Sequence, residues 1–372
     1  MDYSILGKTA LKVSRIGLGC EWLNNQPREL VHAVINNAFD QGINYFDLVY
    51  NFEPFLQNIR HAIKDLNREN LILTHHLGSG EHEGKYRKTR SLGKIIRNFD
   101  RYTNILGTDY ADIGMVHFVM NEKQFEQCCQ ENGVFDLARE FQELGRIQFI
   151  GMSTHDANVA IQAAQKGVCD VIMFQINLAN NGMENRNRAL AICAQHNVGV
   201  IAMKPFAGGR LLMQGSVNIA GYQRGSKGLK KTIKTSISPI QCLHYVLSQP
   251  GLAIALPGVK NLGELNQVLA YNSASDEEKD YAEVLKSFKE YREGQCVYCN
   301  HCSPCPQKID IGEVFRLYDR ALYTNVESVR MQYSMLESKA SDCVKCGECV
   351  SRCPFNVPIL QKMEKSINLF GL

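Results

Sequence analysis

The sequence lacks any apolar run long enough to cross a membrane. A bilayer span needs about 18 or more consecutive apolar residues, and no stretch of the 372 residues approaches that length. The first residues, MDYSILGKTALKV, also lack the basic start and the apolar stretch of a secretory signal. We therefore expect a cytoplasmic protein with no membrane partner.

The sequence also has little excess charge of either sign. Its 41 Lys and Arg residues nearly balance 38 Asp and Glu residues, and charged residues make up 21% of the chain. So small an excess gives no electrostatic reason to expect a nucleic acid partner. With 45% hydrophobic residues, the chain can bury a large core and is not a disordered protein.

Cysteine, by contrast, is abundant and unevenly distributed. Six of the fourteen cysteines are scattered without ligand spacing and are expected to be buried thiols: Cys20, Cys128, Cys129, Cys169, Cys193 and Cys242. The other eight lie in the last 80 residues. In a reducing compartment such clustering favours metal binding over disulfides.

The eight clustered cysteines form two runs, each ending in Cys-Pro. The second run, Cys343-x₂-Cys346-x₂-Cys349-x₃-Cys353-Pro354, matches a [4Fe–4S] pattern in which the fourth cysteine ligates the other cluster. The first run has the same form with a shorter last gap. We therefore assign one cluster to Cys296, Cys299, Cys302 and Cys353, and the other to Cys343, Cys346, Cys349 and Cys305.

Paired zinc sites are the alternative, since they also use Cys-x₂-Cys. Three thiols at consecutive x₂ intervals, found twice, favour iron–sulfur clusters. The residues between the two runs have helical periodicity. We expect residues 293–372 to form a small α-helical ferredoxin-like domain whose two [4Fe–4S] clusters carry single electrons.

The first three quarters of the chain alternate short β-branched runs with longer amphipathic segments. Eight strands are predicted, at 16–20, 45–49, 71–77, 113–119, 147–153, 171–177, 198–204 and 252–258. Their number and spacing predict an α/β fold, a (β/α)₈ TIM barrel over 1–275, with a doubly wound sheet as the alternative. A hairpin around Gly7 precedes the barrel, and a charged bridging helix over 276–292 follows it.

Polar residues gather at the predicted carboxyl ends of the strands, where barrels of this kind carry their active sites. They are Glu21, Asp47, His75, His76, His117, Ser153, His155, Gln175, Asn177 and Lys204. His76 and His155 have no evident partner in the sequence, so we interpret them as structural. The glycines of KPFAGGRL and PGVKNLGEL follow the last two strands, where barrels commonly bind phosphate.

These segments together resemble the aldo/keto reductase family, in its branch with a C-terminal ferredoxin-like domain. The resemblance extends over the whole chain and is carried by ILGKTALKVSRIGLGC, GINYFDLVY, LILTHHLG, DIGMVHF, RIQFIGMSTHD, FQINL, VIAMKPFAGGRL, VLSQPGLAIALPGVKNLGEL and the two cysteine runs. It implies a tetrad of Asp, Tyr, Lys and His, with hydride passing from a nicotinamide to a carbonyl while Tyr donates a proton.

The resemblance identifies the tetrad here in part. Asp47 and His117 match the family Asp and His, but Phe52 occupies the Tyr position and His75 the Lys position. A phenol needs a neighbouring cation to act as an acid at neutral pH. Two replacements stay open: Tyr50 donates the proton, or His75 and His117 hold it.

The resemblance also implies a nicotinamide site. Ser153 and Gln175 match the residues that hold the carboxamide, and Lys204, Gly208 and Gly209 match the pyrophosphate loop. Lys260 is the cation available for a 2′-phosphate, with Glu264 near the place of a common Arg. The cofactor is therefore expected to be NADPH or NADH, without a choice between them.

These features predict an iron–sulfur oxidoreductase of aldo/keto reductase type, acting on a small organic substrate that carries a carbonyl. Electrons would be relayed by the two clusters, with a flavin or an external carrier between one-electron and hydride chemistry. The alternatives are a plain NAD(P)H-dependent reductase with Tyr50 as acid, and a non-enzymatic redox subunit or sensor. The basic stretch 224–234 is either a solvated loop or a docking site for an acidic ferredoxin or flavodoxin.

Overall fold

The computed structural model describes residues 1–181, 183–212, 237–286, 294, 296, 298, 302–322, 325–353 and 356–371. It also gives the backbone of two short strands, β12 (Val217–Ile219) and β13 (Lys231–Ile233), which pair antiparallel. The side chains of the basic stretch 224–234 lie outside the described residues.

The predicted eight strands are confirmed, and all of them are parallel neighbours in one sheet. They are β3 (Leu18–Gly19), β4 (Tyr45–Leu48), β5 (Ile72–Leu77), β8 (Ala111–Val119), β9 (Ile147–Thr154), β10 (Val171–Gln175), β11 (Gly199–Met203) and β14 (Leu252–Leu256). Single bridges from Ile16 to Ala255 and from Gly19 to Gly258 join the first strand to the last. The sheet is therefore nearly closed into the predicted barrel rather than doubly wound.

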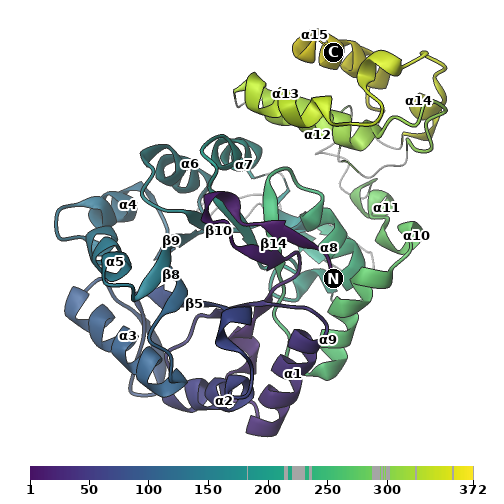
Figure 1. The fold of residues 1–372 in the computed structure, drawn as a ribbon. Helices are drawn as coiled ribbons and strands as arrows, with labels where there is room; N and C mark the ends of the chain where they lie inside the picture. The colour runs from purple at the N-terminus through teal and green to yellow at the C-terminus, as the bar shows by residue number, and fades with distance from the viewer. Residues whose placement is uncertain are drawn as a thin grey trace.

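The barrel helices lie in a ring outside the strands (Figure 1). They are α1 (Arg28–Asp40), α2 (Glu53–Ile63), α3 (Leu92–Leu106), α4 (Glu122–Cys129), α5 (Val134–Glu143), α6 (Ala157–Lys166), α7 (Arg186–Gln195), α8 (Pro239–Leu247) and α9 (Leu262–Leu269). Side-chain caps fix several starts: Asp156 accepts backbone N–H groups of α6, and Ser238 forms a capping box with Gln241. Left-handed Gly107 and Gly167 end α3 and α6.

An N-terminal hairpin, β1 (Tyr3–Ile5) and β2 (Lys12–Ser14), packs against the amino ends of the strands, as predicted. Gly7 in its turn lies so close to the chain at residue 199 that an added Cβ would sit 2.2 Å from the Gly199 nitrogen. The Lys8 amide donates to the Asn197 carbonyl, and its ammonium pairs with Asp170. The hairpin therefore closes the barrel end opposite the predicted active site.

Two apolar layers hold the barrel together. The inner layer fills the barrel and includes hairpin residues Leu6 and Val13 together with Ile113, Met173 and Ile254, all nearly inaccessible to solvent. The outer layer lies between the strands and the helices and continues into the C-terminal region. Because the strands are buried on both faces, they read as continuous apolar runs rather than alternating ones.

A second hairpin, β6 (Ser79–His82) and β7 (Lys85–Lys88), is inserted between β5 and α3. The sequence analysis did not predict it. Its turn residues Glu83 and Gly84 both have positive φ, as a two-residue hairpin turn requires. The hairpin extends the sheet beyond the carboxyl end of β5 and so reaches the end of the barrel where an active site is expected.

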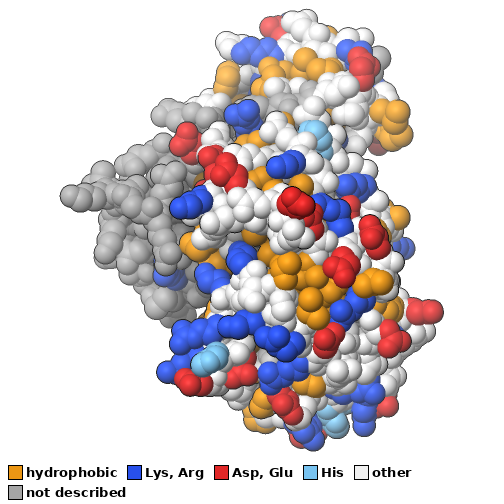
Figure 2. All heavy atoms as spheres, turned by 90° about the vertical axis from the view of Figure 1, so that its left-hand side faces the viewer, with side chains coloured by type: hydrophobic (Ala, Val, Ile, Leu, Met, Phe, Trp, Pro, Cys, Tyr) orange, Lys and Arg blue, Asp and Glu red, His pale blue; other side chains and the backbone are white. Residues whose placement is uncertain are grey.

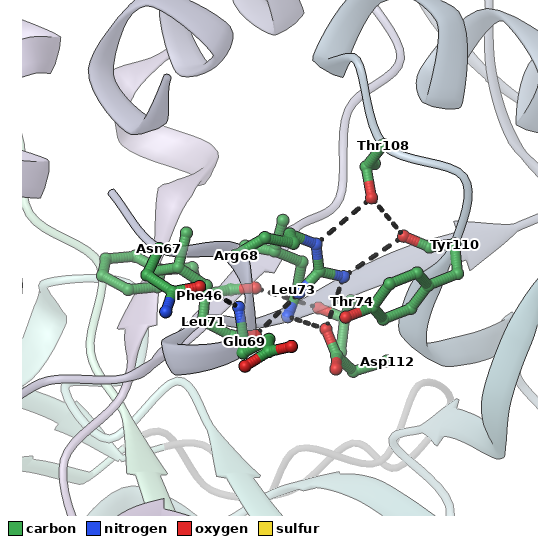
Figure 3. Close-up of polar contacts among 10 residues, drawn as sticks. All are labelled: Phe46, Asn67, Arg68, Glu69, Leu71, Leu73, Thr74, Thr108, Tyr110 and Asp112. Atoms are coloured by element: carbon green, nitrogen blue, oxygen red, sulfur yellow. Dashed lines mark hydrogen bonds and ion pairs between the residues drawn. The ribbon is translucent and has the colours of Figure 1, made fainter. Parts of the chain in front are cut away.

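At the amino ends of β5 and β8, an ion pair joins the two strands (Figure 3). Arg68 Nη2 lies 2.8 Å from Asp112 Oδ2, and the same carboxylate oxygen accepts the Leu73 amide at 2.9 Å. Arg68 also donates to the Leu71 and Tyr110 carbonyls. Burial raises the pKa of Asp112, and the Arg68 guanidinium opposes that rise.

The predicted bridging helix over 276–292 is not one continuous helix in its described part, and residues 287–292 lie outside the described residues. The structure has two short helices there, α10 (Asp276–Lys279) and α11 (Ala282–Lys286), separated at Asp280. Tyr281 is fully buried and its phenol lies 3.0 Å from the Ser248 hydroxyl on the barrel. The segment breaks because it packs onto α8 instead of running through solvent.

The C-terminal region is helical, as predicted, with α12 (Ile311–Ala321), α13 (Val326–Ser334), α14 (Glu348–Arg352) and α15 (Ile359–Phe370). These helices lie together outside the barrel ring, beyond α10 and α11 (Figure 1). Tyr333 stacks on Phe370 at 4.1 Å between ring centroids, and its hydroxyl accepts the Ala340 amide. The region therefore has a small core of its own.

The face of the molecule in Figure 2 carries interspersed acidic and basic side chains, in keeping with the small net charge. Within the described residues, no helix combines the length and the apolar composition needed to cross a membrane.

Candidate functional site

A large cavity opens at the carboxyl ends of the barrel strands. Its volume is about 810 Å³, which is in the range of small-molecule and cofactor sites. Its lining includes three of the four predicted catalytic residues, Asp47, Tyr50 and His117. It also includes all six predicted cofactor residues: Ser153, Gln175, Lys204, Gly208, Gly209 and Lys260.

A hydrogen-bonded chain of acid and base groups forms one wall of the cavity. Asp47 Oδ1 accepts the Thr74 hydroxyl at 2.6 Å and lies 2.9 Å from His76 Nε2. His76 Nδ1 lies 2.8 Å from His117 Nδ1. His117 Nε2 in turn contacts the hydroxyl of Tyr86 on the inserted hairpin. Four elements, β4, β5, β8 and β7, thus bring their side chains into one continuous chain.

The hydrogen-bonded side chains Asp47, His76 and His117 are buried, and burial determines the charge of His117. Asp47, His76 and His117 are each at most 6% exposed. Burial first, and then His76, Arg90 and Lys88, holds the pKa of His117 well below its usual value. His117 is therefore neutral near pH 7 and can accept a proton at one ring nitrogen while it donates at the other.

His75 does not join this chain, contrary to the sequence-based assignment. Its ring packs against Tyr102 and Phe99 on α3, with centroids 4.4 and 5.2 Å away, and it does not line the cavity. Neither ring nitrogen has a hydrogen-bond partner among the described residues. Successive side chains of a strand point to opposite faces, so His76, interpreted as structural, takes the inward position instead.

Tyr50 reaches the cavity but has an unfavourable partner for an acid. Its hydroxyl donates to Glu21 Oε1 at 3.2 Å, and its ring packs beside Phe52 and edge-on to Tyr86. Burial, with a further contribution from the Glu21 carboxylate, raises the pKa of Tyr50 to about 12. A tyrosinate here would face a second negative charge.

Tyr86 is the functional candidate that the sequence analysis missed. It is half-buried, lines the cavity and contacts His117. The Glu-Gly pair at 83–84, a two-residue turn sequence, is the signal that could have revealed its hairpin, although the flanking residues do not alternate in polarity. Nothing in the sequence shows that the hairpin folds back over His117.

Of the two residues expected to bind a carboxamide, Ser153 has a hydrogen-bond partner and the Gln175 amide nitrogen has none among the described residues. Ser153 Oγ accepts the Phe118 amide at 2.8 Å, whereas Nε2 of Gln175 has no partner among the described residues although Gln175 is 4% exposed. A buried donor without a partner is costly unless a ligand accepts its hydrogen. Gln175 therefore fits the amide of a nicotinamide.

The loop after β11 is shaped by left-handed residues. Lys204, Ala207, Gly208 and Gly209 all have φ between 50° and 85°, and an added Cβ at either glycine would meet no atom within 4 Å. The glycines are therefore favoured by their backbone conformation rather than by crowding. Lys204 Nζ lies 3.4 Å from His155 Nε2, and burial, then Lys204 and Lys88, lowers the pKa of His155 to about 3.

Lys260 and Glu264 lie at the start of α9, on the same cavity. The Glu264 carboxylate accepts the Lys260 backbone amide at 2.8 Å, while the Lys260 ammonium lies 4.8 Å from the centre of the Trp22 ring. Asn261 caps α9 by accepting the Glu264 amide, and the Glu264 carboxylate places a negative charge beside Lys260. This arrangement gives no preference for a 2′-phosphate.

Four thiols of the C-terminal region line one small hollow. Cys305 of the first run meets Cys343, Cys346 and Cys349 of the second, together with apolar Ile311. This is the crossed set expected from the spacing of the two runs. Four cysteine thiols in one largely apolar hollow fit a [4Fe–4S] cluster, although no three described His, Cys, Asp or Glu residues group closely enough for a single metal ion.

The other expected set is only partly described, because Cys299 lies outside the described residues. Burial first, with a contribution from the neighbouring Cys353, raises the pKa of Cys296 to about 11. Arg352 joins the two runs directly: its Nη2 donates to the carbonyls of Cys302 at 3.1 Å and Pro304 at 2.7 Å. Arg352 therefore holds the two cysteine runs beside each other.

The scattered cysteines behave as expected. Cys20, Cys128, Cys169, Cys193 and Cys242 are buried, and Cys129 is half-buried. Burial raises the pKa of each of these six thiols. They are protonated packing residues rather than ligands.

The fold and the site define an oxidoreductase of the TIM-barrel class with an appended thiol-rich domain. The chain belongs to the aldo/keto reductase family, whose model matches residues 15–289. A 4Fe-4S dicluster domain matches residues 295–358. The two matches agree with the resemblance seen in the sequence.

Relatives are similar mainly over the barrel. The oxidoreductase YqkF of Bacillus subtilis is 24% identical over 300 residues, covering 76% of this chain and 94% of its own. The NADH-specific methylglyoxal reductase of Escherichia coli is 25% identical, covering 67% and 83%. The holo structure of aldo-keto reductase AKR11C1 from Bacillus halodurans superimposes with a TM-score of 0.60 at 19% identity, covering 78% and 96%, and so shares the fold.

Proposed function

We propose that this chain is a nicotinamide-dependent oxidoreductase that interconverts a small carbonyl compound and its alcohol in the barrel cavity. The observation that carries the proposal is one cavity lined by two sets of residues. The six residues expected to hold a nicotinamide share it with Asp47 and His117. Hydride transfer to a carbonyl needs both a cofactor surface and a proton source within reach of the same substrate.

The residues that would hold the cofactor have distinct tasks. Gln175 and Ser153 would bind the carboxamide, and the glycine loop with Lys204 would lie beside the pyrophosphate. When bound there, a reduced nicotinamide supplies hydride. The chain's own contribution is to orient the carbonyl, to exclude water with the surrounding aromatic side chains, and to supply a proton from the Asp47–His117 wall.

A small aldehyde or ketone is the substrate class that this cavity favours. A bound nicotinamide would fill much of the 810 Å³, leaving the space beside Tyr50, Tyr86 and His117 for the carbonyl compound. The relative that reduces methylglyoxal supports a small oxoaldehyde as the first compound to test. Lys88 and Lys204 on the cavity wall would favour an anionic substituent on the substrate.

We further propose that the C-terminal domain exchanges single electrons with an external carrier. Its four described thiols in one hollow, and the bridge from Arg352 between the two runs, support two [4Fe–4S] clusters at the assigned cysteines. Such clusters supply or accept one electron at a time. An acidic ferredoxin or flavodoxin is the carrier class that we propose.

The test uses anaerobically purified full-length protein with NADH or NADPH, with and without methylglyoxal. We expect a brown protein with about eight irons per chain, carbonyl-dependent loss of the reduced nicotinamide, and a hydroxy product. Failure of both nucleotides to bind, measured by calorimetry, would overturn the reductase proposal. Colourless protein that contains zinc instead of iron would overturn the electron-transfer proposal and leave the reductase proposal standing.

A further inference from the structure

The inserted β6–β7 hairpin is anchored firmly enough to position a side chain. The Ser79 hydroxyl donates to the Val49 carbonyl, and Asn98 Nδ2 of α3 donates to the Ser79 carbonyl at 3.0 Å. The Thr89 amide closes the base of the hairpin on Gly78. Glu81 also pairs with Arg101 of α3. The hairpin is thus attached both to the barrel strands and to α3.

This hairpin places Tyr86 between an aromatic ring, that of Tyr50, and a hydrogen-bonding ring nitrogen, that of His117. On one side its ring lies edge-on to Tyr50, 5.6 Å away between centroids. On the other side its hydroxyl contacts His117 Nε2, and the rings are nearly perpendicular. Because the Tyr86 hydroxyl is the cavity end of the Asp47–His76–His117 chain, it is the point where a proton can leave that chain.

The chain permits two complete hydrogen-bonding patterns. With both histidines neutral, Tyr86 donates to His117 Nε2, His117 Nδ1 donates to His76 Nδ1, and His76 Nε2 donates to Asp47. With His76 protonated, its Nδ1 donates to His117, and His117 Nε2 donates to the Tyr86 oxygen. In this second pattern the Tyr86 proton is free to point into the cavity.

We propose that Tyr86 is the residue that gives its proton to the carbonyl oxygen of the substrate, and that Asp47, His76 and His117 resupply that proton. The proposal rests on the proposed reductase function. It assigns to a hairpin residue, 34 positions beyond Phe52, the acid role that Phe52 cannot fill. The histidine pair takes the place of the missing lysine as the cation that assists the phenol.

Protons and electrons balance in each turnover. The carbonyl carbon accepts hydride from the reduced nicotinamide, the π electron pair moves to the oxygen, and that oxygen forms its O–H bond with the Tyr86 proton. The His117 Nε2 proton then moves to the Tyr86 oxygen, and the His76 Nδ1 proton moves to His117 Nδ1. His76 is left neutral and regains one proton from solvent before the next turnover.

The contacts favour Tyr86 over Tyr50 as the acid. A phenolate on Tyr86 would accept a hydrogen bond from His117 Nε2, whereas a phenolate on Tyr50 would face the Glu21 carboxylate. Burial, with smaller contributions from Tyr50 and Glu21, raises the pKa of Tyr86. The phenol is therefore protonated at neutral pH, which is the form that an acid must have at the start.

The test compares three tyrosine-to-phenylalanine variants of the full-length cluster-containing protein. Tyr86→Phe should lower kcat for methylglyoxal reduction by about 10²- to 10⁴-fold, the usual contribution of a general acid, with the nucleotide Kd unchanged. Tyr50→Phe should keep at least about ten times the activity of Tyr86→Phe. Tyr110→Phe, which removes a phenol beside Arg68 at the opposite end of the strands, is the matched control and should leave kcat unchanged.

A readout independent of turnover uses nitrogen-15 histidine NMR without nucleotide. Tyr86→Phe should shift the resonance of His117 Nε2, because the Tyr86 phenol bonds that nitrogen. Tyr110→Phe, the control, should leave this resonance at its wild-type position. Full activity of Tyr86→Phe in an active wild-type background, or an unshifted His117 resonance, would overturn this inference alone. A wild-type protein that binds no nucleotide would overturn the proposed function and this role together.

Discussion

Replacing Asp47 with Asn tests the proton chain at its buried end. The Asp47 carboxylate accepts two hydrogen bonds, from Thr74 Oγ1 at 2.6 Å and from His76 Nε2 at 2.9 Å. Both bonds reach the same oxygen, Oδ1, so an Asn side chain of nearly the same shape can accept both with its neutral amide oxygen. The charge that supports a protonated His76 is lost while the packing is kept.

Loss of the Asp47 charge interrupts proton transfer along the hydrogen-bonded residues His76, His117 and Tyr86. With Asn at position 47, neutral His76 would keep its single proton on Nε2, where the amide oxygen accepts it, and would have no Nδ1 proton to pass to His117. A hydrogen bond to a charged group contributes about 1.5–3 kcal/mol. At about 1.4 kcal/mol for each factor of ten, we expect kcat to fall by about 10- to 100-fold, and by up to about 10⁴-fold if acid assistance is lost entirely.

The assay is steady-state carbonyl reduction, accompanied by nucleotide binding and thermal unfolding. We expect kcat to fall in Asp47→Asn while the nucleotide Kd and the unfolding temperature stay near the wild-type values. An Asn variant with full kcat would refute the chain as a proton source. A variant that loses its fold would instead assign Asp47 a structural role through Thr74.

Other residues give four further expectations. Gln175→Leu should weaken nucleotide binding measured by calorimetry by about 1–3 kcal/mol, because the bound nicotinamide loses the Gln175 Nε2 donor; unchanged affinity would argue against the assigned cofactor site. Arg68→Ala should lower the free energy of unfolding in urea by roughly 3 kcal/mol, because it leaves the buried Asp112 carboxylate unpaired; a change under about 1 kcal/mol would show that Asp112 is solvated. Burial lowers the pKa of His75 from 6.5 to about 3, so its contribution to the free energy of unfolding is fully present above pH 6.5 and is lost as the pH falls toward 3. His75→Phe should make the free energy of unfolding depend less on pH between 6.5 and 3, and an equally steep dependence would contradict this. Cys305→Ser should remove about four of the eight irons expected per chain, measured by metal analysis; loss of none would contradict the crossed ligand assignment.

Much of the architecture could be predicted because it depends on local composition and spacing. Eight short apolar runs, each followed by an amphipathic segment, favour a barrel over a doubly wound sheet, and either fold gathers the polar strand ends on one side. The spacing within each cysteine run restricts the backbone around a cluster in the same local way. For that reason Ser153, Gln175 and Lys204 could be placed at the carboxyl end of the barrel before their contacts were known, whereas the cofactor role expected of them comes from the family resemblance.

The identity of the proton chain depended on the tertiary structure. All six residues of β5 are buried, so the usual alternation of apolar and polar residues, which would show the inward face, is absent. The pairing of β5 with β4 and β8 is what turns His76 toward Asp47 and His75 toward α3. Tyr86 approaches His117 across 31 positions of sequence because a hairpin docks on the barrel rim. Local sequence determined which side chains gather at the carboxyl end of the barrel, whereas long-range strand register and hairpin docking decided which of them meet.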